Sequence, residues 1–261
     1  TQNGIKIDEW VPGTQIRDNV ISGNTQSGIY TANTSTGTTI YQNSIGVGST
    51  LAALGNSASG LNALGTVKIG TANVDGDKNI IGSNLGSGIV ISGTGASNSV
   101  VEMNEIGSLP GDQSNRGNGQ SGILVDGGAT DVSIGSDIGP AQTMAWNNYS
   151  GVTVDGASTD RIAIFANSLP GNGLAPITLT NGANGGIVHN LTVATADTSG
   201  ISGTANVAGP TTVYYIGGPG FGLFEASNSV AIDQSFYVSS LGVTNDNYWL
   251  YIYDQTNKRS S

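Results

Sequence analysis

The clearest pattern in this chain begins Asn79-Ile80-Ile81-Gly82-Ser83-Asn84-Leu85-Gly86-Ser87-Gly88-Ile89-Val90-Ile91-Ser92-Gly93 and continues Ser99-Val100-Val101-Glu102-Met103-Asn104-Glu105-Ile106-Gly107. About 60 residues earlier, Gly28 and Asn43 take the places of Gly88 and Asn104. About 60 residues later, a weaker copy places Gly151 and Asn167 there. A period kept across the whole unit identifies an internal repeat.

Each unit also has a less regular second half, in which Ser59-Gly60-Leu61 matches Ser121-Gly122-Ile123. Short apolar runs separated by Gly, Asn, Ser and Thr indicate strands and turns, with no helical period between them. Two such strands in each unit predict two coils of roughly 20 to 30 residues. A coil of this kind buries its apolar face only against the coils above and below. The sequence therefore predicts a parallel β-helix, with Ile, Val and Leu filling the bore and asparagines stacked in ladders at the turns.

The composition excludes several classes of function. The chain has 261 residues, 41 of them glycine, and 18 acidic against 8 basic residues give a formal net charge of −10. This balance disfavours nucleic acid and anionic membrane surfaces as partners. Without cysteine there is no disulfide and no thiolate metal site, and the single histidine, His189, excludes a multi-histidine metal site within one chain. The sequence contains no apolar run of 18 residues, so we expect no membrane insertion.

The pattern changes near residue 190, which divides the chain into a predicted β-helix at 1–189 and a second domain at 190–261. Longer strands rich in aromatic and β-branched residues follow, separated by turns such as Gly217-Gly218-Pro219-Gly220. These features predict a small antiparallel β-sandwich. We expect it to cover the end of the coil stack, because an uncapped solenoid exposes strand edges. Its aromatic residues are expected mainly in its core, and a sugar-stacking strip is the alternative.

Two aspartates occupy matching places in neighbouring predicted coils. Asp126 follows Gly122-Ile123-Leu124-Val125, and Asp155 follows Gly151-Val152-Thr153-Val154. If these coils stack directly, the two residues lie one inter-strand spacing apart, about 4.8 Å. That separation suits the carboxyl pair of a retaining glycosidase. The simpler interpretation is that each Asp-Gly closes its strand with a tight turn. The preceding equivalent positions hold Ala32 and Ser92, so no long acidic row is expected.

A second acidic stretch is a weak candidate for calcium. Asn73, Asp75, Asp77 and Asn79 fall at alternate positions and offer oxygen ligands. The glycine of this stretch lies one place early for an EF-type loop, and no bidentate glutamate follows. An Asx-rich turn is therefore the favoured interpretation, and the sequence predicts no cofactor.

Five pieces of the repeat resemble secreted bacterial proteins built of right-handed parallel β-helix repeats, within the pectate-lyase-like superfold. In this chain those pieces are residues 19–24, 28–31, 39–46, 53–56 and 67–71. The resemblance implies export and a shallow groove along one face. It carries over no catalytic residue, because the matching motif is a stacking motif, and the superfold includes polysaccharide enzymes, adhesins and structural surface proteins.

These observations predict an extracellular or cell-surface structural or adhesive protein without catalysis, which associates with itself head to tail into filaments. A carbohydrate-active enzyme using Asp126 and Asp155 is the first alternative, and a glycan-binding module is the second. Basic residues are scattered over the repeat, which argues against a groove for acidic sugars.

Overall fold

The computed structural model describes residues 2–71, 78–110, 115–136 and 142–186, followed beyond residue 190 by the backbone of seven strands. The predicted domain boundary at 189/190 and His189 lie outside the described residues.

Three parallel sheets make up the described part of the chain before residue 187. The first sheet contains β1 (Ile5–Ile7), β4 (Ile29–Thr31), β7 (Leu61–Ala63), β10 (Ile89–Ser92), β13 (Ile123–Asp126), β16 (Val152–Asp155) and β19 (Ile177–Thr180). The second contains β2 (Gln15–Arg17), β5 (Thr38–Tyr41), β8 (Val67–Ile69), β11 (Val100–Val101), β14 (Ser133–Ile134) and β17 (Ala163–Ile164). The third contains β3 (Val20–Ile21), β6 (Ser44–Ile45), β9 (Ile80–Ile81), β12 (Glu105–Ile106), β15 (Gln142–Met144) and β18 (Asn167–Ser168).

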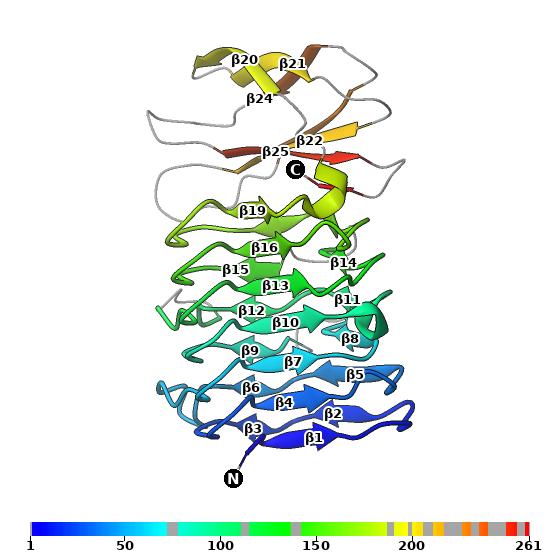
Figure 1. The fold of residues 1–261 in the computed structure, drawn as a ribbon. Helices are drawn as coiled ribbons and strands as arrows, with labels where there is room; N and C mark the ends of the chain where they lie inside the picture. The colour runs from blue at the N-terminus through cyan, green and yellow to red at the C-terminus, as the bar shows by residue number, and fades with distance from the viewer. Residues whose placement is uncertain are drawn as a thin grey trace.

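Consecutive strands go to the first, second and third sheet in turn, so three strands make one coil and each coil lies on the one before. This is the arrangement of a parallel β-helix, and it confirms the predicted all-β, parallel architecture. In Figure 1 the chain crosses the front in β1, returns behind through β2 and β3, and climbs as it does so, which makes the coil right-handed. Ile29 pairs with Leu61 and Leu61 with Ile89, so the 60-residue repeat corresponds to two coils, as predicted.

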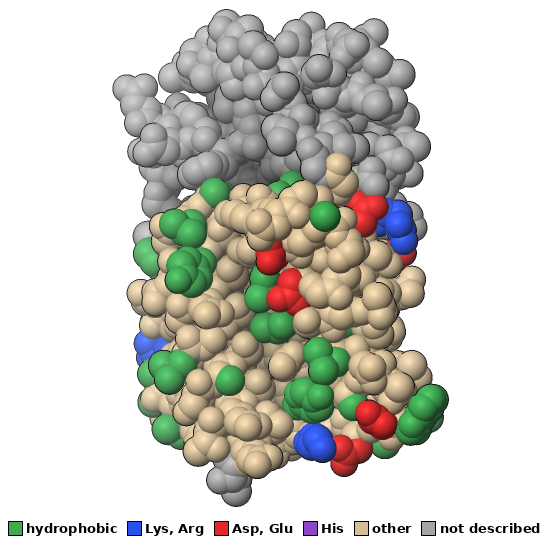
Figure 2. All heavy atoms as spheres, in the orientation of Figure 1, with side chains coloured by type: hydrophobic (Ala, Val, Ile, Leu, Met, Phe, Trp, Pro, Cys, Tyr) green, Lys and Arg blue, Asp and Glu red, His purple; other side chains and the backbone are tan. Residues whose placement is uncertain are grey.

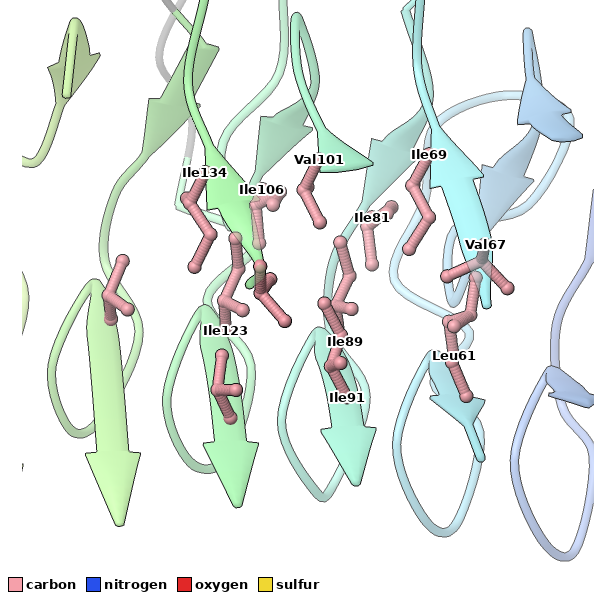
Figure 3. Packing of buried hydrophobic residues seen from close by; sticks show 14 of the residues in the cluster. Leu61, Val67, Ile69, Ile81, Ile89, Ile91, Val101, Ile106, Ile123 and Ile134 are labelled. Carbon is pink, nitrogen blue, oxygen red and sulfur yellow. The ribbon is translucent and has the colours of Figure 1, made fainter. Parts of the chain in front are cut away.

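The core follows from the alternation of side chains along each strand. In β10, Ile89 and Ile91 are buried while Val90 and Ser92 between and after them are partly exposed. The same position in neighbouring coils is again apolar, because Ile89 pairs with Leu61 on one side and Ile123 on the other. Figure 3 shows these side chains inside the bore, facing Ile69, Val101 and Ile134 from the second sheet. The predicted filling of the bore by Ile, Val and Leu is confirmed.

Two ladders of carboxamide side chains run along the corners of the coil stack. The first ladder, between the second and third sheets, consists of Asn19, Asn43, Asn79, Asn104, Gln142 and Asn167. The second ladder, between the third and first sheets, consists of Asn24, Asn56, Asn84, Asn118, Asn147 and Asn172. In the second ladder each side-chain amide donates to the carboxamide oxygen of the next coil at 2.7 to 3.0 Å. The predicted asparagine ladders are thus confirmed.

A row of glycines lies directly before the first sheet, where neighbouring coils approach closely. A Cβ atom on Gly28, Gly60, Gly88 or Gly122 would lie 2.7 Å from the carbonyl oxygen of the equivalent glycine in the next coil. None of these four has a positive φ, so the requirement for glycine here comes from close packing between coils.

Beyond residue 190 the described strands form two antiparallel sheets. One contains β20 (Leu191–Asp197), β21 (Gly200–Ala205) and β24 (Ser235–Ser239). The other contains β23 (Ala226–Val230), β22 (Thr211–Ile216), β25 (Trp249–Asp254) and β26 (Arg259–Ser260). β26 lies beside β17 at the end of the coil stack. The sandwich packing of these two sheets stays a prediction.

Candidate functional site

An open groove of about 310 Å³ lies on the outer face of the first sheet, over β13, β16 and β19. Its lining consists of Ser87, Gln120, Ser121, Leu124, Tyr149, Ser150, Thr153, Leu174, Thr178 and Thr180. We refer to these ten residues as the groove.

The floor of the groove is built by strand alternation. Leu124, Thr153 and Thr178 are the outward-facing residues at the middle of their strands, and backbone register places them side by side. The residues directly before and after each of them along its strand point into the bore. Floor residues therefore repeat at the inter-strand spacing of about 4.8 Å.

One wall of the groove is the corner that leads into the first sheet. Gln120, Tyr149 and Leu174 each stand two residues after an asparagine of the second ladder. The backbone N–H of Tyr149 donates to the carbonyl of Gln120 at 3.2 Å, and that of Leu174 donates to Tyr149 at 3.1 Å. The ladder thus fixes the spacing of the wall. Tyr149 and Leu174 remain 49% and 54% exposed, which leaves an aromatic ring and an aliphatic side chain open to solvent.

Pairs of hydroxyl groups connect the wall to the floor. The oxygens of Ser121 and Thr153 lie 2.7 Å apart, and those of Ser150 and Thr178 lie 2.6 Å apart. Ser121 and Ser150 are buried, so the hydroxyls that a ligand can reach are those of the partly exposed Thr153 and Thr178. Because successive coils carry the same pair, the groove offers polar groups at a regular spacing.

The two predicted aspartates lie at the end of the same outward face. Leu124 pairs with Thr153 and Val125 with Val154, so Asp126 and Asp155 are the next residues along two neighbouring parallel strands. The two coils therefore stack directly, which is the condition under which these residues lie side by side. Figure 2 shows acidic side chains beside hydrophobic ones near the middle of this face.

Asp155 is held as a carboxylate by its neighbours. Its Oδ1 accepts hydrogen bonds from Thr180 Oγ1 at 2.7 Å and from Asn181 Nδ2 at 2.6 Å. These bonds favour the charged form and lower the pKa of Asp155, with the Gly156 backbone adding to the effect. Thr180 lines the groove and Asp155 does not, so the Asp155 carboxylate lies one hydrogen bond behind the groove lining.

Asp126 is arranged differently from Asp155. Its Oδ1 is covered and has no hydrogen-bond partner within the described part of the chain. Its β-strand neighbour on the other side is Ser92, as the sequence indicated. After both aspartates the chain turns through glycines with positive φ, Gly127 and Gly156, which agrees with the interpretation of Asp-Gly as a strand-closing turn. The turn and a role in binding are compatible, because the turn is made by the backbone.

The calcium candidates are placed only in part. Asn73, Asp75 and Asp77 lie outside the described residues. Asn79 is fully buried in the first ladder, where its Oδ1 accepts from the Asn43 amide at 3.0 Å and its Nδ2 donates to Asn104 at 2.8 Å. Both ends of its carboxamide are therefore engaged in hydrogen bonds of the first ladder. Among the described residues, no group of three or more His, Cys, Asp or Glu side chains is placed to hold a metal ion.

Two glutamates, Glu102 and Glu105, are buried, which the sequence pattern did not indicate. The Lys68 ammonium lies 2.8 Å from Glu102 Oε1, in an ion pair that is not aligned as a hydrogen bond. Glu105 Oε1 accepts a hydrogen bond from Ser108 Oγ at 2.5 Å, and burial raises the pKa of Glu105 above its ordinary value. Glu102 follows β11 of the second sheet and Glu105 lies in β12 of the third sheet, and neither is part of the groove lining.

A comparison with known proteins found no matching family model and no matching curated protein. None of the helices in the described residues has the length and apolar character needed to cross a membrane.

Proposed function

We propose that this chain is an extracellular or cell-surface adhesive protein whose β-helix presents a polysaccharide-binding groove and does not cleave its ligand. The single observation behind this proposal is the open groove over β13, β16 and β19. Secretion, and kinship with the pectate-lyase-like superfold, belong to the same proposal and rest on the sequence resemblance.

The chemistry of the groove suits sugars. A sugar ring has an apolar face of C–H groups and an edge of hydroxyls, and the exposed ring of Tyr149 together with Leu124 and Leu174 offers surface for the former. The hydroxyls of Thr153 and Thr178, which the buried Ser121 and Ser150 orient, offer hydrogen bonds to the sugar hydroxyls. Both kinds of contact recur from coil to coil at a spacing close to the length of one sugar ring.

Binding is tested by titrating oligosaccharides of different lengths into the protein, with isothermal calorimetry as the readout. We expect affinity to increase with chain length up to the span of three coils, and Tyr149→Ala to weaken binding about tenfold or more. Tyr41→Ala is the matched control, because Tyr41 lies on the second sheet. Equal affinity of Tyr149→Ala and the unchanged protein would contradict the proposal.

Cleavage of a glycan by Asp126 and Asp155 is the second candidate function. It is favoured by one observation, the placement of the two carboxylates at successive positions of neighbouring strands, with Asp155 held ionised as a nucleophile requires. The test is depolymerisation of a polysaccharide panel by the unchanged protein and by the Asp126→Asn/Asp155→Asn variant. Release of new reducing ends by the unchanged protein alone would establish this candidate and overturn the non-catalytic proposal.

Head-to-tail self-association completes the proposal. In the described residues β1, β2 and β3 are the outermost strands of their three sheets, so one edge of each sheet presents unpaired backbone groups. At the other end of the stack, β26 of the C-terminal sheets lies beside β17, which supports the proposed capping role.

A further inference from the structure

We infer that the groove selects a polysaccharide with free amino groups, such as an oligomer of glucosamine, over neutral and acidic glycans. This inference rests on the proposed glycan binding and adds the chemical class of the ligand. The two carboxylates that lie next to the groove carry it.

The carboxylates of Asp126 and Asp155 stand at one end of the groove floor, on the same outward face as Leu124 and Thr153. Thr180 is shared between the two features, since it lines the groove and donates to Asp155 at 2.7 Å. The hydrogen bonds to Asp155 are made by neutral donors, so its negative charge is oriented and remains uncompensated. The Asp126 carboxylate adds a second negative charge beside it, although its Oδ1 is covered by the chain itself and is closed to a ligand.

The cationic side chains that the structure describes are engaged elsewhere. Lys6 pairs with Asp8 on the first coil, Lys68 pairs with Glu102 on the second sheet, and Arg161 pairs with Asp131. Arg116 donates to the backbone carbonyls of Leu51 and Asn115. None of these residues, nor Arg17 or Lys78, lines the groove.

These charges decide between classes of glycan. A uronate or sulfated sugar would place its anion near two carboxylates in a protein of net charge −10, which is unfavourable. A neutral sugar supplies no positive charge, so it gains nothing from the two carboxylates. A protonated amine supplies three N–H donors and one positive charge, so it can make a charge-assisted hydrogen bond to the Asp155 carboxylate and is attracted by the charge of Asp126.

The test compares two hexamers of the same length, one of glucosamine and one of N-acetylglucosamine, by calorimetry at a pH where the amines are protonated. We expect the amine form to bind at least tenfold more tightly, and this preference to shrink at high salt. The Asp126→Asn/Asp155→Asn variant should lose the preference while retaining weak binding of both hexamers. Asp18→Asn, at an exposed residue directly after β2, is the matched control and should keep the preference.

The outcomes separate the two levels of the proposal. Equal or tighter binding of the acetylated hexamer, with no effect of the double substitution, would overturn the inference and leave glycan binding intact. Binding of neither hexamer by the unchanged protein would overturn both. Hexalysine of the same charge provides the third comparison, and equally tight, aspartate-dependent binding of this peptide would show that charge alone is recognised, which contradicts selection of a sugar.

Discussion

At the scale of single residues, the ladder asparagines determine how well neighbouring coils hold together. Asn147 is almost fully buried, and its Oδ1 accepts from both the backbone N–H of Asn118, at 3.2 Å, and the Asn118 side-chain amide, at 2.9 Å. Asn147→Ala would leave these donors unsatisfied, and we expect a loss of about 2 to 4 kcal/mol in the free energy of unfolding. Urea denaturation of the variant and of the unchanged protein measures this difference in the free energy of unfolding. Asn148, the exposed next residue, is the matched control, and an equal loss in Asn148→Ala would contradict this account of the ladder.

The titration of Asp155 gives a second prediction at the residue scale. Hydrogen bonds from Thr180 and Asn181 lower the pKa of Asp155 in the folded chain. The stabilisation from this shift is therefore complete above the unfolded pKa of about 3.9 and is lost as the pH falls through the lower folded pKa. In Thr180→Val we expect the Asp155 pKa, followed by carboxyl NMR, to move upward. Thr178→Val is the control because Thr178 bonds Ser150 instead, and a shift of the same size there would argue against a direct role of Thr180.

At the scale of elements, the glycine row before the first sheet sets the distance between coils. A Cβ on Gly88 would meet the carbonyl of Gly122 at 2.7 Å, Ile106 Cγ2 at 2.8 Å and Asn118 Nδ2 at 2.9 Å. Because the backbone there is fixed on both sides by parallel pairing, Gly88→Ala should destabilise the fold by roughly 1 to 3 kcal/mol.

Gly48→Ala is the comparison for this prediction. A Cβ on Gly48 would have Ala52 O at 3.8 Å as its nearest neighbour, and the φ of Gly48 is not positive. Its unfolding midpoint should stay close to that of the unchanged protein. Similar midpoints for both variants in thermal or urea unfolding would show that close packing of coils does not explain the glycine row.

The strands of the first sheet were readable from the sequence because their signal is local. Gly88-Ile89 recurs as Gly28-Ile29 and Gly151-Val152, and the structure places all three in the same sheet. The second ladder was harder to read, because coils differ in length from 24 residues, between Ile5 and Ile29, to 34, between Ile89 and Ile123. Asn56 and Asn118 keep the roughly 60-residue period of two coils, but their spacing from Asn84, in the coil between them, is unequal.

The groove could be predicted only in part for a related reason. The matching sequence of the two strands and the alternation of side chains placed Asp126 and Asp155 side by side, because each is the last, outward-facing residue of its strand. It did not indicate the wall, because Tyr149 and Leu174 lie at a corner whose residue types vary from coil to coil. Likewise, the bond between Thr180 and Asp155 joins β19 to β16 and requires knowledge of which strands are neighbours.

At the scale of the whole molecule, the two ends of the coil stack differ. The edge of β1, β2 and β3 is at one end, and the C-terminal strand β26 lies beside β17 at the other. If copies join at the first edge, a charge placed there should prevent association, as charged residues do on natural edge strands. Val20 in β3 is 52% exposed and suits this purpose. We expect the unchanged protein to form larger species as its concentration rises in sedimentation velocity, and Val20→Lys to remain a monomer.

The control for this prediction adds the same charge away from the edge. Leu85 is 68% exposed at a corner in the middle of the stack, so Leu85→Lys should associate like the unchanged protein. If Leu85→Lys also remains monomeric, association occurs through the side of the β-helix and the head-to-tail arrangement is wrong. If the unchanged protein is a monomer at every concentration, the edge of β1 to β3 does not join copies of this chain, and adhesion through the groove would then operate from single molecules.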